Sequence, residues 1–147
     1  MKEMRVLIDA DGCPVVNIAI NYCKQKSIEV IVLCDTCHVF KIDGVQTITV
    51  DKGADSVDFK LVNMLEKGNI VITQDYGLAA MCLARRAIAI SQNGMIYNNS
   101  NIDALLLARH TSKKIRNAGG RIKGNSKRTP QQDEEFSVMF LKLLEGN

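Results

Sequence analysis

Short apolar runs recur along the chain, and segments with the periodicity of amphipathic helices separate them. Three of these runs are almost continuous Val, Ile and Leu, which is typical of strands that are covered on both faces in a parallel sheet. The segments that we predict as strands are Arg5–Ile8, Glu29–Cys34, Thr47–Val50, Ile70–Thr73 and Ala87–Ile90.

Helical patterns fill the intervals between these strands. Val15–Lys26 is the first predicted helix, and Leu78–Arg86 is the third. In the second, Asp55–Lys67, the apolar residues lie on one stripe and Gly68 follows as a stop signal. This alternation of strand and helix predicts an α/β fold with a parallel sheet and right-handed crossovers.

After the fifth strand the pattern changes. Asn93-Gly94 lies between apolar segments, which predicts a tight hairpin turn and an added strand. Ser100 is predicted to cap the next helix, with Asp103 three residues later as the acid of a capping box. That helix should end at the Gly-Gly pair that begins at Gly119, and its apolar stripe consists of Ile102, Leu105, Leu106 and Ile115.

The end of the chain contains a basic, glycine-containing segment and one more helix. Residues 119–129, GGRIKGNSKRT, are predicted to form a mobile loop. Thr129 and Pro130 then begin a last helix, whose core stripe is Phe136, Met139, Phe140, Leu143 and Leu144. We therefore predict a single three-layer α/β domain over residues 1–147, with a mostly parallel sheet, an added hairpin strand and two C-terminal helices.

Aspartates follow the ends of several predicted strands. Asp9 follows the first strand, Asp75 follows the fourth, and Asp55 and Asp58 open the helix after the third. Because the carboxyl ends of parallel strands meet at one edge of the sheet, where open α/β proteins place their sites, we expect these side chains to lie together. Asp11 lies two residues after Asp9 and belongs to the same group.

A group of carboxylates at one edge favours a divalent metal ion. Carboxylates within a few ångströms repel each other, and a cation relieves this repulsion. Mg²⁺ and Mn²⁺ prefer hard oxygen ligands, and a bound ion can activate water for phosphodiester cleavage. Asp also favours turns and helix N-caps, so each acid taken singly has an equally good structural explanation. We interpret Asp35, Asp43 and Asp51 as turn residues, because nothing pairs them with the others.

The composition is that of a globular protein, with 46% hydrophobic and 24% charged residues in a chain of 147. No apolar stretch is long enough to span a membrane, and the N-terminus shows no signal-peptide pattern. Five cysteines without such a signal are typical of reduced thiols. We therefore expect a cytoplasmic protein without a membrane partner.

The net charge of +3 hides an uneven distribution. Eight of the 19 Lys and Arg residues lie between Arg109 and Arg128, a stretch without any acid. By itself this stretch is typical of a solvated helix face and loop, but beside an acidic metal edge it favours binding of a phosphodiester backbone. Aromatic residues for base stacking are scarce, and the two candidates, Tyr76 and Tyr97, fit packing equally well. The candidate nucleic-acid-binding residues are Arg109, Lys113, Arg116, Arg121 and Lys123.

The first motif also allows another interpretation, which is weaker than the metal site. The first strand with its Asp-x-Asp-Gly resembles haloacid-dehalogenase-like phosphatases, in which Asp9 would be a covalent nucleophile and Asp11 a general acid. That chemistry needs a downstream lysine and a late acidic pair, and the best pair in this chain comes too early.

The segment CDTCH, residues 34–38, has the spacing of haem attachment or of half a zinc site. Haem attachment requires export, and a zinc site requires two further ligands. We interpret Cys34 and Cys37 as reduced thiols at a strand end.

Five blocks of the chain resemble the YaiI/YqxD family of uncharacterised bacterial proteins and occur in the family's order. They are DADGCPV at 9–15, GADSVD at 53–58, IVITQDYGLAA at 70–80, NGMIYNNSNIDALLLARH at 93–110 and DEEFSVMFLKLL at 133–144. The family is regarded as PIN-like and akin to the NYN nucleases. The resemblance implies a Rossmann-like sheet with an acidic metal site, built on the matching Asp9, Asp11, Asp55, Asp58 and Asp75.

From these residues and the resemblance we expect a Mg²⁺- or Mn²⁺-dependent phosphodiester hydrolase, a ribonuclease of PIN-like type with RNA as its partner. Asp9, Asp58 and Asp75 are the expected catalytic residues, and Asp9 and Asp75 would bind the metal directly or through water. Asp58 and Asp55 would complete the site or orient the attacking water, and Asp11 would hold a second metal or support the first. The alternative is a non-catalytic PIN-like module that binds nucleic acid or a protein.

Overall fold

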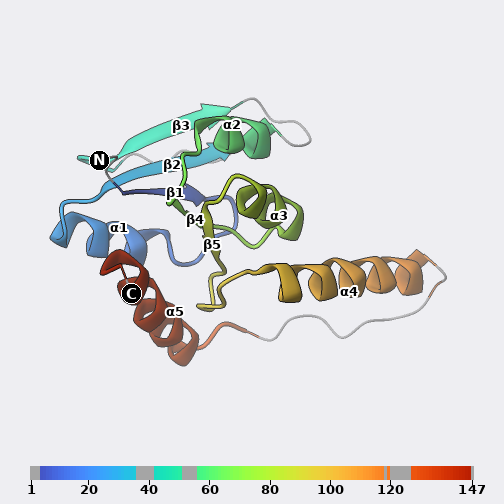
Figure 1. The fold of residues 1–147 in the computed structure, drawn as a ribbon. Helices are drawn as coiled ribbons and strands as arrows, with labels where there is room; N and C mark the ends of the chain where they lie inside the picture. The colour runs from blue at the N-terminus through green and yellow to red at the C-terminus, as the bar shows by residue number, and fades with distance from the viewer. Residues whose placement is uncertain (1–3, 36–41, 51–55, 118, 120–126, 147) are drawn as a thin grey trace.

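The computed structural model describes residues 4–35, 42–50, 56–117, 119 and 127–146. Strands and helices alternate as far as β5, after which two helices follow each other (Figure 1). Each predicted strand is confirmed and differs from its prediction by one residue at one end. In chain order, the elements are β1 (Arg5–Asp9), α1 (Val16–Gln25), β2 (Glu29–Asp35), β3 (Gln46–Val50), α2 (Ser56–Met64), β4 (Ile70–Ile72), α3 (Tyr76–Ala84), β5 (Ile88–Ile90), α4 (Asn99–Asn117) and α5 (Pro130–Leu144).

The five strands form one parallel sheet in the order β3-β2-β1-β4-β5. β1 is central, and its Ile8 pairs with Val32 of β2 on one side and with Ile72 of β4 on the other. The chain moves outward from β1 to β3 and then returns to β4, so the strand order reverses between β1 and β4. Such a switch point leaves a crevice outside the carboxyl ends of the strands, where open α/β sheets bind ligands.

Helices cover both faces of this sheet (Figure 1). α1 and α5 pack on one face, and α2, α3 and the start of α4 pack on the other. Successive residues of β1 point to opposite layers: Ile8 belongs to the same apolar cluster as the stacked pair Phe136 and Phe140, whereas Leu7 packs in the cluster that contains Leu78. The structure is therefore a three-layer α/β fold of the Rossmann-like kind, as the sequence predicts.

The predicted turn after β5 is present, but the added strand is reduced to one antiparallel bridge between Ile90 and Ile96. Gly94 has a left-handed φ of +88° in this turn. The Ser91 N–H donates to the Met95 carbonyl oxygen, the Met95 N–H donates to the Ser91 hydroxyl, and the Asn98 cap of α4 then ends the returning segment.

The two C-terminal helices begin differently from each other. Thr129 caps α5 as predicted, in a reciprocal capping box with Gln132. The prediction that Ser100 caps α4 is wrong, because α4 begins at Asn99 and the capping bonds join Asn98 and Asn101. An asparagine two residues earlier caps at least as well as serine, so the helix starts there.

The C-terminal half of α4 extends beyond the sheet layers (Figure 1). Ile102 is buried, but Leu107 is 66% exposed and Ile115 is 43% exposed. Ile115, which the sequence places on the apolar stripe of this helix, is not buried, because no described element packs over that turn of α4. Most of the predicted loop at 119–129 lies outside the described residues.

Among the residues that the structure describes, none of the helices is both long and apolar enough to cross a membrane.

Candidate acidic site at the carboxyl ends of β1 and β4

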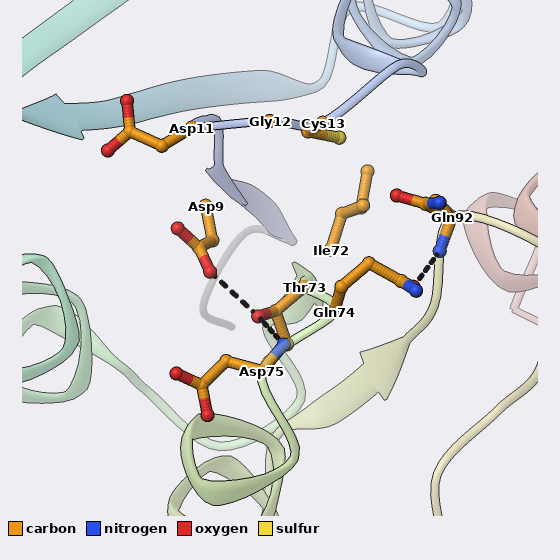
Figure 2. Close-up of a pocket in the computed structure, with 9 residues that line it drawn as sticks. All are labelled: Asp9, Asp11, Gly12, Cys13, Ile72, Thr73, Gln74, Asp75 and Gln92. Atoms are coloured by element: carbon orange, nitrogen blue, oxygen red, sulfur yellow. Dashed lines mark hydrogen bonds between the residues drawn. The ribbon is translucent and has the colours of Figure 1, made fainter. Parts of the chain in front are cut away.

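The switch point brings Asp9 and Asp75 to one edge of the sheet. Asp9 is the last residue of β1, and Asp75 follows β4 and caps α3 by accepting a hydrogen bond from the Leu78 N–H at 3.1 Å. Thr73 links the two: its hydroxyl donates to Asp9 Oδ2 at 2.8 Å and accepts the Asp75 N–H at 3.0 Å. Figure 2 shows both carboxylates on the same side of this threonine.

Tyr97, which belongs to the apolar cluster that contains Leu78, fixes the position of Thr73. The Tyr97 side chain is only 2% exposed, and its hydroxyl donates to the Thr73 carbonyl oxygen at 3.1 Å. Its ring packs edge-on against Tyr76, with 6.2 Å between the ring centroids. Of the two aromatic residues considered for base stacking, Tyr97 therefore serves packing, and Tyr76 remains partly exposed beside it.

A cavity of about 240 Å³ opens beside Asp9. On the far side from the acids, the Gln74 side chain accepts the Gln92 N–H at 2.8 Å, which joins the β4–α3 loop to the turn after β5. No lysine is among the described residues that line the cavity. The lining residues are Asp9, Asp11, Gly12, Cys13, Ile72, Thr73, Gln74, Asp75 and Gln92 (Figure 2).

Burial raises the pKa of the Asp9 carboxyl from 3.8 to about 6. The hydrogen bond from Thr73 acts in the opposite direction, and the carboxylates of Asp58, Asp75 and Asp11 add to the increase. The structure thus gathers four of the five predicted acids, from three separate segments, into one electrostatic group. Asp55, the fifth, lies outside the described residues.

Asp75 also lines a second pocket, of about 360 Å³, on the other side of the β4–α3 loop. Asp58 from the first turn of α2 and Arg109 from α4 contribute to it. Arg109 Nη1 lies 3.9 Å from Asp75 Oδ1, so the cation faces the carboxylate that caps α3. Asp75 is therefore common to the Asp9 cavity and to the Asp58 pocket.

Asp11 has a different environment from Asp9. Its Oδ2 accepts the Asp35 N–H at 3.0 Å, which ties the loop after β1 to the end of β2. In Figure 2 its carboxylate points away from Thr73 and Asp75. This places Asp35, which we predicted only as a turn residue, at the same sheet edge, and it places Asp11 in a supporting position.

The described acids are suited to a water-mediated metal ion. Within the described part of the chain, no three His, Cys, Asp or Glu side chains form a ready coordination group. Mg²⁺ takes one or two carboxylates directly and keeps several of its waters, so it does not require three. Asp9 and Asp75 supply two hard oxygen donors, and the raised pKa of Asp9 marks a carboxylate that a cation would stabilise.

The basic candidates fall into separate groups. Arg109 reaches the acidic site, and Lys113 is exposed further along α4. Arg116 lies near the end of α4, whereas Arg121 and Lys123 are outside the described residues.

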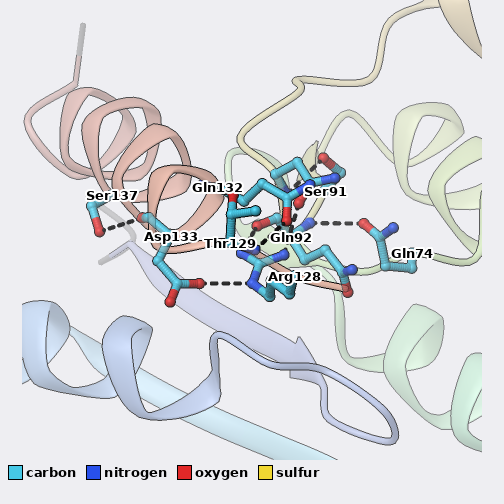
Figure 3. Close-up of polar contacts among 9 residues, drawn as sticks. Gln74, Ser91, Gln92, Arg128, Thr129, Gln132, Asp133 and Ser137 are labelled. Atoms are coloured by element: carbon cyan, nitrogen blue, oxygen red, sulfur yellow. Dashed lines mark hydrogen bonds and ion pairs between the residues drawn. The ribbon is translucent and has the colours of Figure 1, made fainter. Parts of the chain in front are cut away.

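Arg128, at the end of the basic stretch, has a structural role (Figure 3). Its guanidinium donates to Asp133 Oδ1, to Asn93 Oδ1 and to the Gln92 carbonyl oxygen, each at 2.7 Å. These bonds join the start of α5 to the turn after β5, next to the wall of the Asp9 cavity. Arg128 therefore stabilises the contact between α5 and the turn after β5.

The cysteine motif is only partly described. Cys34 is fully buried and free, while Cys37 and His38 lie outside the described residues. Burial also raises the pKa of the Cys82 thiol to about 12, and the carboxylates of Asp58 and Asp9 add to this shift.

Sequence reasoning overlooked Thr73, Gln74, Gln92 and Phe59. Thr73 ends a predicted strand and Gln74 follows it, directly before a selected acid, in IVITQD, so their position gave a usable signal. Gln92 acts through its backbone N–H, which carries no sequence signal. Phe59 lines the second pocket and immediately follows Asp58, yet it reads as an ordinary apolar helix residue.

Comparison with known proteins places the chain among close relatives. The sequence profile of a family described as "Uncharacterized BCR, YaiI/YqxD family" matches residues 7–146. A UPF0178 protein of Exiguobacterium sibiricum is 52% identical over 141 residues, which cover 96% of each chain. A UPF0178 protein of Ruminiclostridium cellulolyticum is 49% identical over 142 residues, 96% of this chain and 92% of the relative. A third, of Clostridium acetobutylicum, is 43% identical over 143 residues, 96% and 97% of the two chains.

Proposed function

The chain belongs to the YaiI/YqxD family, and we propose that it is a Mg²⁺- or Mn²⁺-dependent phosphodiester hydrolase that acts on RNA. The observation that carries this proposal is the Asp9–Thr73–Asp75 arrangement at the switch point of a parallel sheet. The family that the sequence blocks resemble is regarded as PIN-like, and this supports the same chemistry. An RNA substrate would place the activity in the cytoplasm, where the free thiols of the described cysteines stay reduced.

The electrostatics of Asp9 support a metal in this place. Burial and three neighbouring carboxylates disfavour its ionised form, and a divalent cation between Asp9 and Asp75 would reverse that balance. A metal bound there would polarise the scissile phosphate and lower the pKa of a bound water. Asp9 and Asp75 would hold the ion, directly or through its waters.

The remaining residues would position the substrate and the water. Thr73 fixes the orientation of the Asp9 carboxylate through its hydroxyl and sets the start of α3 through its bond to the Asp75 N–H. Asp58, which lines the neighbouring pocket together with Asp75, would accept a hydrogen bond from the attacking water. Arg109, which faces Asp75, would bind a phosphate oxygen of the backbone.

A cleavage assay tests this proposal. Wild-type protein is incubated with a fluorescently labelled single-stranded RNA in Mn²⁺, in Mg²⁺ or in EDTA, and products are resolved on a gel. We expect cleavage with metal only, and its loss in Asp9→Asn and Asp75→Asn. The matched control is Asp43→Asn, the same chemical change at an exposed turn that leads into the amino end of β3.

One observation favours a second candidate, a non-catalytic module that binds nucleic acid. The described residues contain no ready three-ligand metal group, and a binding module needs none. Under this alternative, the wild-type protein binds RNA equally well with and without metal, cleaves none of it, and is unaffected by Asp9→Asn. That combination of results would contradict the hydrolase.

A further inference from the structure

Phe59 is an exposed aromatic side chain beside the acidic site. It lies on α2 next to Asp58 and is 60% exposed, while Leu61, two residues later, is fully buried in the core. A single exposed apolar residue needs no explanation by itself. Phe59, however, forms part of the wall of a pocket, and the other residues of that pocket make its position informative.

The pocket combines an apolar surface with one cation and with the carboxylates of Asp58 and Asp75. Phe59 and Met81 supply the apolar part, Arg109 supplies the positive charge, and Gly77 leaves room because it has no side chain. The pocket of about 360 Å³ is formed by residues of α2, α3 and α4, and it falls within the size range of small-ligand sites. A flat aromatic group matches the apolar part of this lining, and Arg109 is the residue that could contact a negative charge next to that group.

Asp75 connects this pocket to the Asp9 cavity, because it lines both. A third, open pocket of about 370 Å³ contains Gln74, Tyr76, Arg109 and again Asp75. Arg109 therefore lines one pocket with the exposed Phe59 and another with the partly exposed Tyr76. A chain of alternating charged and flat groups, such as a single-stranded nucleic acid, presents phosphates and bases in a matching arrangement.

We propose that the Phe59 pocket receives one unpaired nucleobase, stacked on the Phe59 ring, while Arg109 contacts the adjoining phosphate. A base within a duplex is stacked on both faces and cannot enter, so the protein selects single strands. The inference rests on the proposed function only for the role of the neighbouring acidic cavity as the place of cleavage. The stacking contact itself requires neither metal nor catalysis.

Binding of labelled oligonucleotides in EDTA tests the inference directly. The probes are a ten-nucleotide oligouridylate, a ten-unit ribose-phosphate chain without bases, and a ten-base-pair RNA duplex, each measured by fluorescence anisotropy with the full chain. A stacked base contributes roughly 1–3 kcal/mol, so we expect Phe59→Ala to weaken oligouridylate binding by about 5-fold to 150-fold. Phe59→Trp should preserve binding, because tryptophan also offers a flat aromatic face.

The chain without bases provides the sharper comparison. Wild-type protein should bind it about as weakly as Phe59→Ala binds oligouridylate, and Phe59→Ala should bind it no more weakly than wild type does. Val138→Ala is the matched control, because Val138 is 48% exposed on α5, in the other helix layer. Thermal melting of each variant verifies that it is folded.

Several results would overturn the inference: equal binding of oligouridylate by wild type and Phe59→Ala, tighter binding of the duplex, or no binding of oligouridylate by wild type. A DNA oligonucleotide of the same length distinguishes whether the unpaired base comes from RNA or from DNA. If binding depends on Phe59 but no cleavage occurs with metal, the pocket inference stands and the hydrolase proposal fails. If cleavage occurs and Phe59→Ala has no effect on binding, the hydrolase proposal stands and the pocket inference fails.

Discussion

Replacing Asp9 by asparagine separates the function of this residue from its effect on stability. The asparagine side-chain oxygen can still accept the Thr73 hydroxyl hydrogen bond, which measures 2.8 Å in the wild-type protein. The substitution removes only the negative charge that burial and the carboxylates of Asp58, Asp75 and Asp11 disfavour. We therefore expect Asp9→Asn to be inactive and yet more stable than wild type at neutral pH.

The magnitude follows from the pKa of Asp9, which is raised from 3.8 in the unfolded chain to about 6 in the folded protein. Between these two values the folded protein holds a proton that the unfolded chain has released, so stability falls as the pH rises from about 4 to about 6 and stays lower above it. The full shift corresponds to about 3 kcal/mol. Because Asp9 is partly exposed, solvent screening reduces this to roughly 1–2 kcal/mol.

Thermal melting between pH 4 and pH 8 measures the effect. For a chain of this size 1 kcal/mol changes the melting temperature by about 3 °C, so Asp9→Asn should melt roughly 3–6 °C above wild type at pH 7.5 and converge with it near pH 4. Saturating Mn²⁺ should raise the melting temperature of wild type and leave that of Asp9→Asn unchanged. A variant that is less stable than wild type at pH 7.5, or a stability difference that does not vary with pH, would refute the electrostatic reasoning.

Two further predictions concern the packing of the C-terminal part. Gly94→Ala should lower the free energy of unfolding by about 2–4 kcal/mol in urea denaturation, because a left-handed φ of +88° combines with a new Cβ only 2.7 Å from the Glu135 carbonyl oxygen. Gly68→Ala is the control: its φ is +86° but its Cβ would meet nothing within 4 Å, so it should lose only about 1 kcal/mol, and equal losses would contradict the clash. Arg128→Ala should lose about 2 kcal/mol, because its three hydrogen bonds join α5 to the turn after β5. Lys127→Ala, at an exposed neighbour, should lose nothing measurable, and if Arg128→Ala lowered only RNA affinity, its structural role would be wrong.

Local patterns in the sequence were sufficient for the elements and for part of the site. Apolar runs located all five predicted strands. Three of these runs are almost continuous, because burial on both faces of a parallel sheet requires apolar side chains at successive positions. The Thr129-Pro130 start of α5 was equally readable, since an N-cap involves only the first turn of a helix. Asp9 and Asp75 could be selected as strand-end acids for the same reason: each follows its own apolar run.

Contacts between distant segments were decided by the tertiary structure. The Thr73–Asp9 hydrogen bond spans 64 residues and exists because the strand order makes β1 and β4 neighbours. Tertiary contacts also join Asp11 to the Asp35 N–H and Arg128 to the turn after β5, and among the described residues no element covers Ile115. Periodicity reports which face of an element is apolar, but it contains no information about which other element covers that face. For this reason the sequence alone determined which acids follow strands, whereas only the folded sheet determined which of them meet.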